Sequence, residues 1–345
     1  MFLKKKSTVF FFTVAILITT ICLYIYKSSY TKYGQLDFKI TAMLKVVNLI
    51  NLDLKHTKHK ELRDTLNNLI KILPFPLDKV KKIQDLKIPF ENKSIPIRIY
   101  TPETKKESLP IIIYYHGGGM VLWNLDAYDG LCRSLAKKTE ALVFSVDYSL
   151  APENPFPTAI EESYYALEWI AKNAKKFKGN PAKIAVAGDS AGGTLATVMT
   201  ILARDRQGPK IVAQTLFYPV TNFSNTNTKS YKDFATGYLL TKDMMQWFRK
   251  AYLPYEKDWS NPLASPLLTK NLKGLPPAFI IIGQFDPLRD EGKSYAKKLE
   301  INEVPVILKK YPDVVHAFMS IEILSQTDQA KNETAIFLNK YFQNL

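Results

Sequence analysis

The 345-residue sequence contains little cysteine and little histidine, two and four residues respectively. The two cysteines, Cys22 and Cys132, cannot build a disulfide framework, and no Cys/His spacing typical of zinc ligation occurs. Internal repeats and low-complexity tracts are also missing, which argues against a solenoid or a disordered chain. We therefore predict a globular protein that uses neither a metal nor another cofactor.

Acidic residues are outnumbered by basic ones, and the formal net charge is +15. A basic balance of this size raises the question of a nucleic-acid or anionic-membrane partner. Within the main part of the chain, however, the lysines are scattered, and no basic run is interleaved with aromatic residues as single-strand binding requires. We predict a lysine-rich surface and no nucleic-acid partner. The composition contains no signal for an oligomeric state.

The first 26 residues differ from the rest. A basic flank at residues 1–6 precedes residues 7–26, which carry no charge and are mostly apolar. A run of about 20 such residues can cross a bilayer core about 30 Å thick. The denser positive charge before the run predicts that the main domain lies on the non-cytoplasmic side of the membrane. We predict a single-pass signal anchor; a signal peptide, cleaved to release a secreted protein, and a buried core helix are the alternatives.

The remaining chain divides into two patterns. Residues 30–78 have apolar residues at three- and four-residue spacings and are predicted to form helices. From residue 82 to 345, short apolar runs alternate with helix-like segments, which is typical of an α/β fold with a mainly parallel sheet and helices on both faces. The exception is the stretch of about 220–277, which contains no strand pattern. Together with residues 30–78, we expect it to form a helical cap.

One apolar run leads into a glycine-flanked serine. Residues 183–187 are followed by Gly188-Asp189-Ser190-Ala191-Gly192, and a helix-like segment begins directly after this motif. A strand, a Gly-x-Ser-x-Gly turn and a helix form the nucleophile elbow of α/β-hydrolases. The alternative is an ordinary glycine-rich turn that caps a helix, but the strand–turn–helix setting favours Ser190 as a nucleophile.

A serine nucleophile needs a base, and four histidines make the search short. His56 and His59 lie upstream among lysines, where we expect exposed loop residues, and His116 belongs to a glycine-rich loop. His316 follows the last predicted strand and lies after the serine, as the chain order of this fold requires. We predict that His316 is the base.

The acid partner should lie between the serine and the histidine and should follow a strand. Asp286 does so directly after the run at residues 278–282 and its short extension. Asp290 and Glu291 are rivals, but they fall on the predicted helix that follows. Asp286 is therefore the preferred partner, with the role of orienting the imidazole of His316.

A glycine-rich loop follows the predicted strand at residues 110–115. It consists of His116, Gly117, Gly118 and Gly119. Glycines allow backbone N–H groups to approach a substrate oxygen closely, as in the oxyanion loop of esterases. The phosphate-binding alternative lacks both the P-loop lysine and the dinucleotide-binding spacing. We predict an oxyanion hole made by Gly117–Gly119 and the Ala191 N–H.

These motifs resemble the hormone-sensitive lipase family of α/β-hydrolases, which includes bacterial esterases and membrane-anchored arylacetamide deacetylases. The resemblance begins near residue 95 and rests on the motifs at 116–119, 147–157, 188–193, 286–292 and 316–318. It implies the Ser190–His316–Asp286 triad, the same oxyanion donors, supporting roles for His116 and Asp189, and a helical cap.

The sequence therefore predicts a carboxylic-ester hydrolase that forms an acyl-enzyme with a small-molecule ester. By family resemblance, we expect short- to medium-chain acyl or aryl esters. An amidase or deacetylase with the same triad is one alternative, because amides pass through the same intermediate. A ligand-binding homologue without catalysis is another, although the presence of His316 argues against it.

Overall fold

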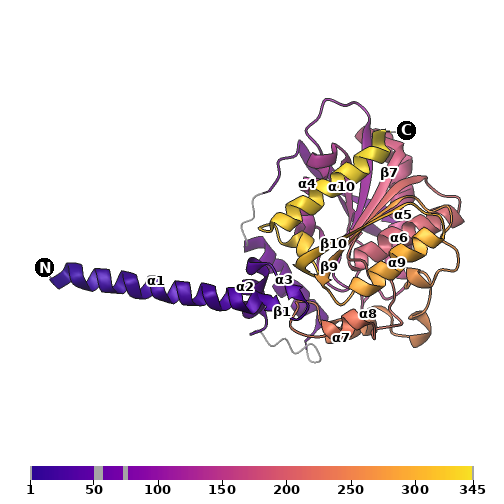
Figure 1. The fold of residues 1–345 in the computed structure, drawn as a ribbon. Helices are drawn as coiled ribbons and strands as arrows, with labels where there is room; N and C mark the ends of the chain where they lie inside the picture. Colours follow the sequence, from indigo (N-terminus) through magenta and orange to yellow (C-terminus); the bar gives the residue numbers. More distant parts are fainter. Residues whose placement is uncertain (1, 50–56, 73–76, 344–345) are drawn as a thin grey trace.

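The computed structural model describes residues 2–49, 57–72 and 77–343, and its centre is an eight-stranded sheet (Figure 1). The strand order is β10-β9-β8-β7-β5-β6-β4-β3. Strands β5 to β10 pair in parallel, whereas β4 pairs antiparallel with β6 and with β3. The strand bounds are β3 Lys82–Phe90, β4 Lys93–Thr101, β5 Leu109–Tyr115, β6 Leu142–Val146, β7 Gly179–Asp189, β8 Ile211–Phe217, β9 Ala278–Phe285 and β10 Val306–Val315. The predicted α/β class with a mainly parallel sheet is confirmed.

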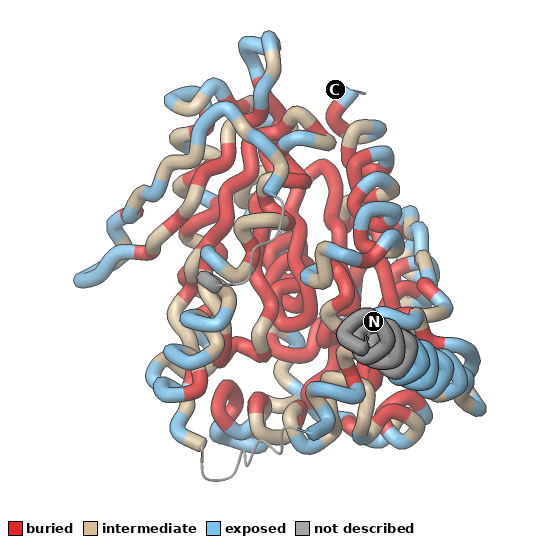
Figure 2. The backbone as a smooth tube through the Cα atoms, turned by 90° about the vertical axis from the view of Figure 1, so that its left-hand side faces the viewer, coloured by how far each residue is buried: buried red, intermediate tan, exposed pale blue. Residues whose placement is uncertain are grey.

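Helices cover both faces of this sheet, which explains the continuous apolar runs of the central strands. In β5, Ile111 and Ile113 belong to the core on one face, and Ile112 and Tyr114 belong to the core on the other. Because neighbouring side chains point to opposite faces, a strand buried on both sides needs apolar residues at every position. All seven residues of β5 are buried, as the burial-coloured trace shows for the centre of the fold (Figure 2).

The two faces are covered by different helices. Residues of α5, α6 and α9 pack in one core, and residues of α4 and α10 pack in the other. Each of the central helices follows a strand and runs back across the sheet, which is the usual parallel crossover. The bounds are α4 Asp129–Thr139, α5 Thr158–Asn173, α6 Ala191–Asp205, α9 Arg289–Ile301 and α10 Ser325–Gln343.

A second group of helices lies at the carboxyl end of the parallel strands. The helices are α2 Phe38–Val47, α3 His59–Ile72, α7 Lys229–Asp233 and α8 Lys242–Tyr252. Two contacts join the N-terminal helices to the 220–277 stretch: the Asn48 amide donates to the Gly237 carbonyl at 3.2 Å, and His59 stacks on Trp247. Part of the predicted helical region, including Pro74 and Pro76, lies outside the described residues. The division into cap and catalytic domain stays a prediction.

The N-terminal helix α1, Phe2–Ser29, projects away from the rest of the protein (Figure 1). Its apolar side chains are exposed where they are described, with Ile16 65% and Leu17 58% accessible. At its base, the Lys45 ammonium donates to the Tyr24 hydroxyl at 3.3 Å. Among the described residues, no helix is long and apolar enough to cross a membrane, and the transmembrane anchor stays a prediction. Residues 7–13 of the predicted span lie outside the described side chains.

Candidate active site

Ser190 lies on a sharp turn between β7 and α6. Its backbone has φ 52° and ψ −119°, a conformation that a non-glycine residue adopts only at a cost of roughly 1–3 kcal/mol. Two bonds hold the turn: the Ser190 N–H donates to the Phe217 carbonyl at 2.8 Å, and the Val220 N–H donates to the Ser190 carbonyl at 3.1 Å. The turn directs the Oγ atom away from the sheet at its carboxyl edge.

Glycines on both sides of Ser190 are required by close packing. A Cβ atom on Gly188 would lie 2.2 Å from the Gly192 carbonyl oxygen. A Cβ atom on Gly192 would lie 1.9 Å from the Tyr115 carbonyl oxygen at the end of β5. Any other residue would push the helix or the neighbouring strand away from the serine.

His316 and Asp286 reach Ser190 from the ends of two other strands. The Ser190 Oγ lies 3.0 Å from His316 Nε2, and His316 Nδ1 lies 2.8 Å from Asp286 Oδ2. In this arrangement the serine hydroxyl donates to Nε2 while the Nδ1–H donates to the carboxylate. Asp286 is fully buried, and its second oxygen accepts the Leu288 N–H at 2.8 Å. The three side chains therefore form one continuous hydrogen-bonded chain.

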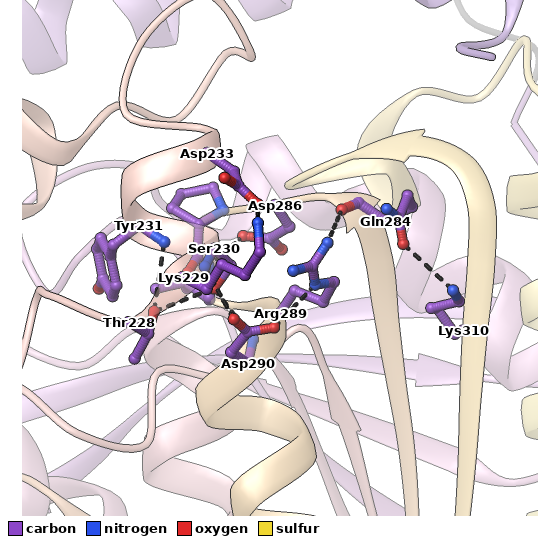
Figure 3. A network of polar contacts seen from close by, with 12 residues as sticks. Thr228, Lys229, Ser230, Tyr231, Asp233, Gln284, Asp286, Arg289, Asp290 and Lys310 are labelled. Atoms are coloured by element: carbon purple, nitrogen blue, oxygen red, sulfur yellow. Dashed lines mark hydrogen bonds and ion pairs between the residues drawn. The ribbon is translucent and has the colours of Figure 1, made fainter. Parts of the chain in front are cut away.

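The rival acid Asp290 has a different set of partners (Figure 3). Its carboxylate accepts the Ser230 N–H at 2.8 Å and the Arg289 Nε–H at 2.9 Å. The Ser230 hydroxyl in turn donates to the Pro287 carbonyl at 2.7 Å. Asp290 thus fastens the helix α7 to the loop that carries Asp286, and only Asp286 contacts His316.

The glycine-rich loop lies after β5, next to the serine turn. Gly118 and Gly119 have φ values of 108° and 65°, so this backbone conformation favours glycine. A Cβ atom on Gly119 would lie 2.3 Å from the Phe248 ring of α8. Ala191 begins α6, where backbone N–H groups have no partner within the helix. The predicted oxyanion donors therefore border the same turn as Ser190.

The sequence from residue 112 to 320, more than half of the chain, matches the family described as the alpha/beta hydrolase fold. The chain belongs to this family. Within it, the relatives place the hydrolase among the hormone-sensitive lipase-like members, as the sequence motifs predicted.

Several relatives of the hydrolase are known. It is 42% identical over 245 residues to the carboxylic ester hydrolase LipN of Mycobacterium tuberculosis, a match that covers 69% of this chain and 65% of LipN. The Saccharolobus solfataricus arylesterase is 35% identical over 82% of this chain and 92% of its own length. A solved structure of a hyperthermophilic esterase from Pyrobaculum calidifontis superposes with a TM-score of 0.84 at 36% identity, covering 88% of this chain and 98% of that one.

In this hydrolase, Asp189 supports the glycine-rich loop. Its carboxylate accepts the Gly117 N–H at 2.7 Å, the Tyr114 hydroxyl at 2.7 Å and the Tyr128 hydroxyl at 3.0 Å. Burial raises the pKa of Asp189 to about 6, although its three donors act in the opposite direction. Through the Gly117 N–H, Asp189 attaches the first glycine of the loop to the sheet. The tyrosines that complete this network were not predicted from the sequence, because nothing local marks them.

His116 does not act as a second base in the hydrolase. Its Nδ1–H donates to the Gly117 carbonyl at 2.7 Å, and its ring stacks on Tyr148 with centroids 4.4 Å apart. Burial lowers the pKa of His116 to about 4, so the ring is neutral at physiological pH. Its contacts are those of a residue that shapes the loop.

Glu291, the other rival acid, lies in the interior behind Asp286. Its carboxylate accepts the Thr221 N–H at 2.6 Å and the Asn222 N–H at 3.3 Å, where the chain leaves β8 for the cap stretch. Burial, with a further contribution from the charge of Asp286, raises the pKa of Glu291 to about 8. Near neutral pH, Glu291 is therefore a buried neutral acid that fastens the start of the 220–277 stretch to α9.

Substituting Glu291 with glutamine should make the stability of the hydrolase less dependent on pH. Between the ordinary pKa of about 4.5 and the native pKa of about 8, the native protein holds a proton that the unfolded chain has lost. Rising pH in this window therefore lowers the free energy of unfolding, by up to about 1.4 kcal/mol per pH unit. Glutamine keeps the acceptor for Thr221 and does not titrate. Urea unfolding of both proteins from pH 5 to pH 8 measures the difference, and parallel curves would contradict the assignment.

A pocket of about 830 Å³ lies next to the loop that follows His316, and its lining includes neither the triad nor the glycines at 117–119. It is lined by Ala317, which directly follows His316, and by Trp123 and Tyr128, which border the glycine-rich loop. Its outer wall carries Arg98 and Asp126, which form an ion pair at 2.8 Å.

Proposed function

We propose that the chain is a carboxylic-ester hydrolase that works through an acyl-Ser190 intermediate. The observation that carries the proposal is the continuous contact from Ser190 Oγ to His316 Nε2, at 3.0 Å, and from His316 Nδ1 to Asp286, at 2.8 Å. The relatives named carboxylic ester hydrolase, arylesterase and esterase support the same reaction.

In the first half of the reaction, Ser190 attacks the carbonyl carbon of the ester while its hydroxyl proton moves to His316 Nε2. The carbonyl oxygen becomes an oxyanion that accepts N–H groups from the glycine-rich loop and from Ala191. Collapse of this intermediate breaks the bond to the alcohol oxygen, which leaves with the proton from His316. Asp286 holds the Nδ1–H throughout and balances the charge of the imidazolium.

In the second half, a water molecule attacks the acyl-Ser190 carbonyl and gives one proton to His316. The second tetrahedral intermediate collapses, Ser190 Oγ recovers the proton, and a carboxylic acid leaves. The net reaction consumes one water and one ester and yields one acid and one alcohol. Every proton transfer uses the same Nε2 atom, so His316 is the base in each attack and the acid in each collapse.

The proposed substrates are short- to medium-chain acyl or aryl esters. The relative named arylesterase supports aryl esters, and the family resemblance supports short to medium acyl chains. Amide hydrolysis is the second candidate, because the same contacts would act on an amide, whose leaving group also needs a proton from His316.

The experiment pairs substrate turnover with labelling of the serine. Matched p-nitrophenyl esters and p-nitroanilides of increasing acyl length are compared, and a fluorophosphonate probe is mapped to its peptide by mass spectrometry. We expect ester turnover to exceed anilide turnover and the adduct to lie on Ser190. A protein that binds the esters without turnover and remains unlabelled would be a non-catalytic homologue, which contradicts the proposal.

For the location of the protein, we propose that residues 7–26 form a single-pass anchor, with the catalytic domain on the non-cytoplasmic side. The exposed apolar side chains of α1, such as Ile16 and Leu17, support a lipid environment, and the basic residues before the run support the orientation. A secreted form produced by signal cleavage is the alternative. Membrane fractionation with carbonate extraction distinguishes the two: release of the intact chain into the wash would contradict an anchor.

A further inference from the structure

Arg63 of the cap helix α3 contacts the segment that directly follows the glycine-rich loop. Its Nε–H donates to the Val121 carbonyl at 2.6 Å, and an Nη–H donates to the Ala151 carbonyl. The guanidinium also pairs with Glu153 at 2.7 Å, and only 14% of the Arg63 side chain is accessible. Arg63 and Val121 are 58 residues apart in the chain, so this contact exists only when α3 packs on the catalytic domain.

The segment that Arg63 contacts is under backbone strain. After the glycines, Met120 has φ 62° and Trp123 has φ 75°, a left-handed conformation that costs non-glycine residues of the order of 1 kcal/mol each. The Val121 and Leu122 N–H groups both donate to the Gly118 carbonyl, at 3.0 and 2.8 Å, which closes a tight turn. A strained turn of this kind keeps its shape only when its surroundings hold it.

Two charged side chains hold the loop at opposite ends. Asp189 accepts the Gly117 N–H at the sheet side, and Arg63 donates to the Val121 carbonyl at the cap side. Arg63 also binds the Ala151 carbonyl, and the Ala151 N–H donates to the Met120 carbonyl at 2.8 Å. The guanidinium therefore adds to an existing hydrogen bond between the Met120 and Ala151 segments. The predicted oxyanion donors lie between these two attachments.

Helix α3 also contacts α8, which borders the same loop. His59, one helical turn before Arg63, stacks on Trp247 of α8 with centroids 4.5 Å apart. The next residue of α8, Phe248, lies against Gly119. His59 therefore begins a helix and is half-buried, whereas the sequence predicted an exposed loop histidine. The pattern could not reveal this, because the aromatic partner lies nearly 190 residues away.

We propose that Arg63 is a positioning residue for the oxyanion hole, and this rests on the proposed esterase function. Arg63 does not touch the reacting atoms. Its planar, forked guanidinium holds the Val121 and Ala151 carbonyls at one separation, which fixes the turn after the glycines and with it the direction of their N–H groups. A lysine offers a single ammonium and cannot span two carbonyls in this fixed geometry. Docking of the N-terminal cap thereby completes the catalytic site.

The test compares Arg63→Ala, Arg63→Lys and Glu153→Gln on a p-nitrophenyl ester, with kcat expressed per active site titrated by fluorophosphonate. Loss of one oxyanion donor costs about 100- to 1,000-fold in rate, and a displaced loop should cost part of this. We expect Arg63→Ala to lower kcat by about 10- to 100-fold, with KM changed by less than about threefold, and Arg63→Lys to recover only part of the loss. Glu153→Gln removes the ion pair and leaves both carbonyl contacts, so its kcat should stay within about twofold of the wild type.

Two further readouts separate positioning from a general structural role. Methylguanidinium at millimolar concentration should raise the kcat of Arg63→Ala but not that of the wild type, because it can occupy the vacated space between the two carbonyls. The pH profile of kcat should keep its midpoint in every variant, because the His316–Asp286 contact is unchanged.

The outcomes distinguish this proposal from the proposed function. If the wild type hydrolyses esters but Arg63→Ala and Arg63→Lys have wild-type kcat per titrated site, the positioning role is wrong and the esterase assignment stands. The positioning role is also wrong if Glu153→Gln lowers kcat as much as Arg63→Ala does, or if Arg63→Ala shifts the midpoint of the pH profile. A wild type that neither labels nor turns over esters overturns both proposals together. The lysine variant preserves charge and length, so it tests the role even where the alanine variant folds poorly.

Discussion

Ser190→Ala is expected to lower the kcat for ester hydrolysis by about 10⁶-fold, because the substitution removes the atom that forms the acyl intermediate. His316 Nε2 has Ser190 Oγ as its partner at 3.0 Å, and without that oxygen the base has no nucleophile to activate. Alanine keeps the Cβ atom, so the strained turn at φ 52° is neither relieved nor worsened. The measurement is turnover of a p-nitrophenyl ester, together with the thermal midpoint of unfolding.

The matched control is Ser134→Ala. Ser134 is equally buried but lies on α4, outside the site, so its substitution should leave kcat within about twofold. Ester turnover by Ser190→Ala within tenfold of the wild type would refute the acyl-enzyme mechanism. An equal loss of activity in both variants would indicate damage to the fold instead.

The second large effect is expected for Asp286→Asn, with a fall in kcat of about 10⁴-fold. The Asp286 carboxylate accepts the Nδ1–H of His316 at 2.8 Å, which leaves Nε2 free to receive the serine proton. An asparagine amide can instead donate to Nδ1. The imidazole then carries its proton on Nε2, where it can no longer act as the base. The loss therefore arises from the wrong tautomer and not from a change of shape, since the two side chains have the same size.

Asp290→Asn is the control for Asp286→Asn, because Asp290 lies on the same loop–helix segment but contacts Ser230 and Arg289 instead of the triad. Its kcat should change by less than about tenfold, through the position of the loop alone. The assignment of the acid would be reversed if Asp290→Asn proved the more damaging of the two substitutions. Both variants are compared by single-turnover acylation, which reports proton removal from Ser190 directly.

The parts of the site that are local in sequence could be predicted from the sequence. The elbow is one such part, because β7, the Gly188–Gly192 turn and α6 are consecutive. Glycine is required at both ends of this turn because a Cβ atom there would clash with the backbone, and this holds wherever the turn occurs. His316 was found by exclusion among four histidines, and Asp286 by its position at the end of a strand. The fold class followed in the same way from apolar runs that alternate with helical segments.

Other features depend on residues far apart in the chain. Strand β10 extends to Val315, directly before His316, because its pairing with β9 continues past an irregularity after Tyr311. The Tyr114 and Tyr128 hydroxyls that bind Asp189, and the carboxylate of Glu291 that binds Thr221, carry no local signal. Their side chains meet only because the sheet and the cap bring different elements together.

The sequence by itself determined the family, the nucleophile, its base and the glycine-rich loop, because this chemistry needs particular residue types in short motifs and in one chain order. Only the tertiary structure decided which acid touches His316, what holds the glycine-rich loop, and that His59 and Arg63 of the N-terminal region reach the site. The physical reason is that a hydrogen bond or a ring stack requires a separation of a few ångströms. Residues that are 58 or more positions apart in the chain are brought this close by tertiary packing, and no periodic pattern in the sequence indicates the contact.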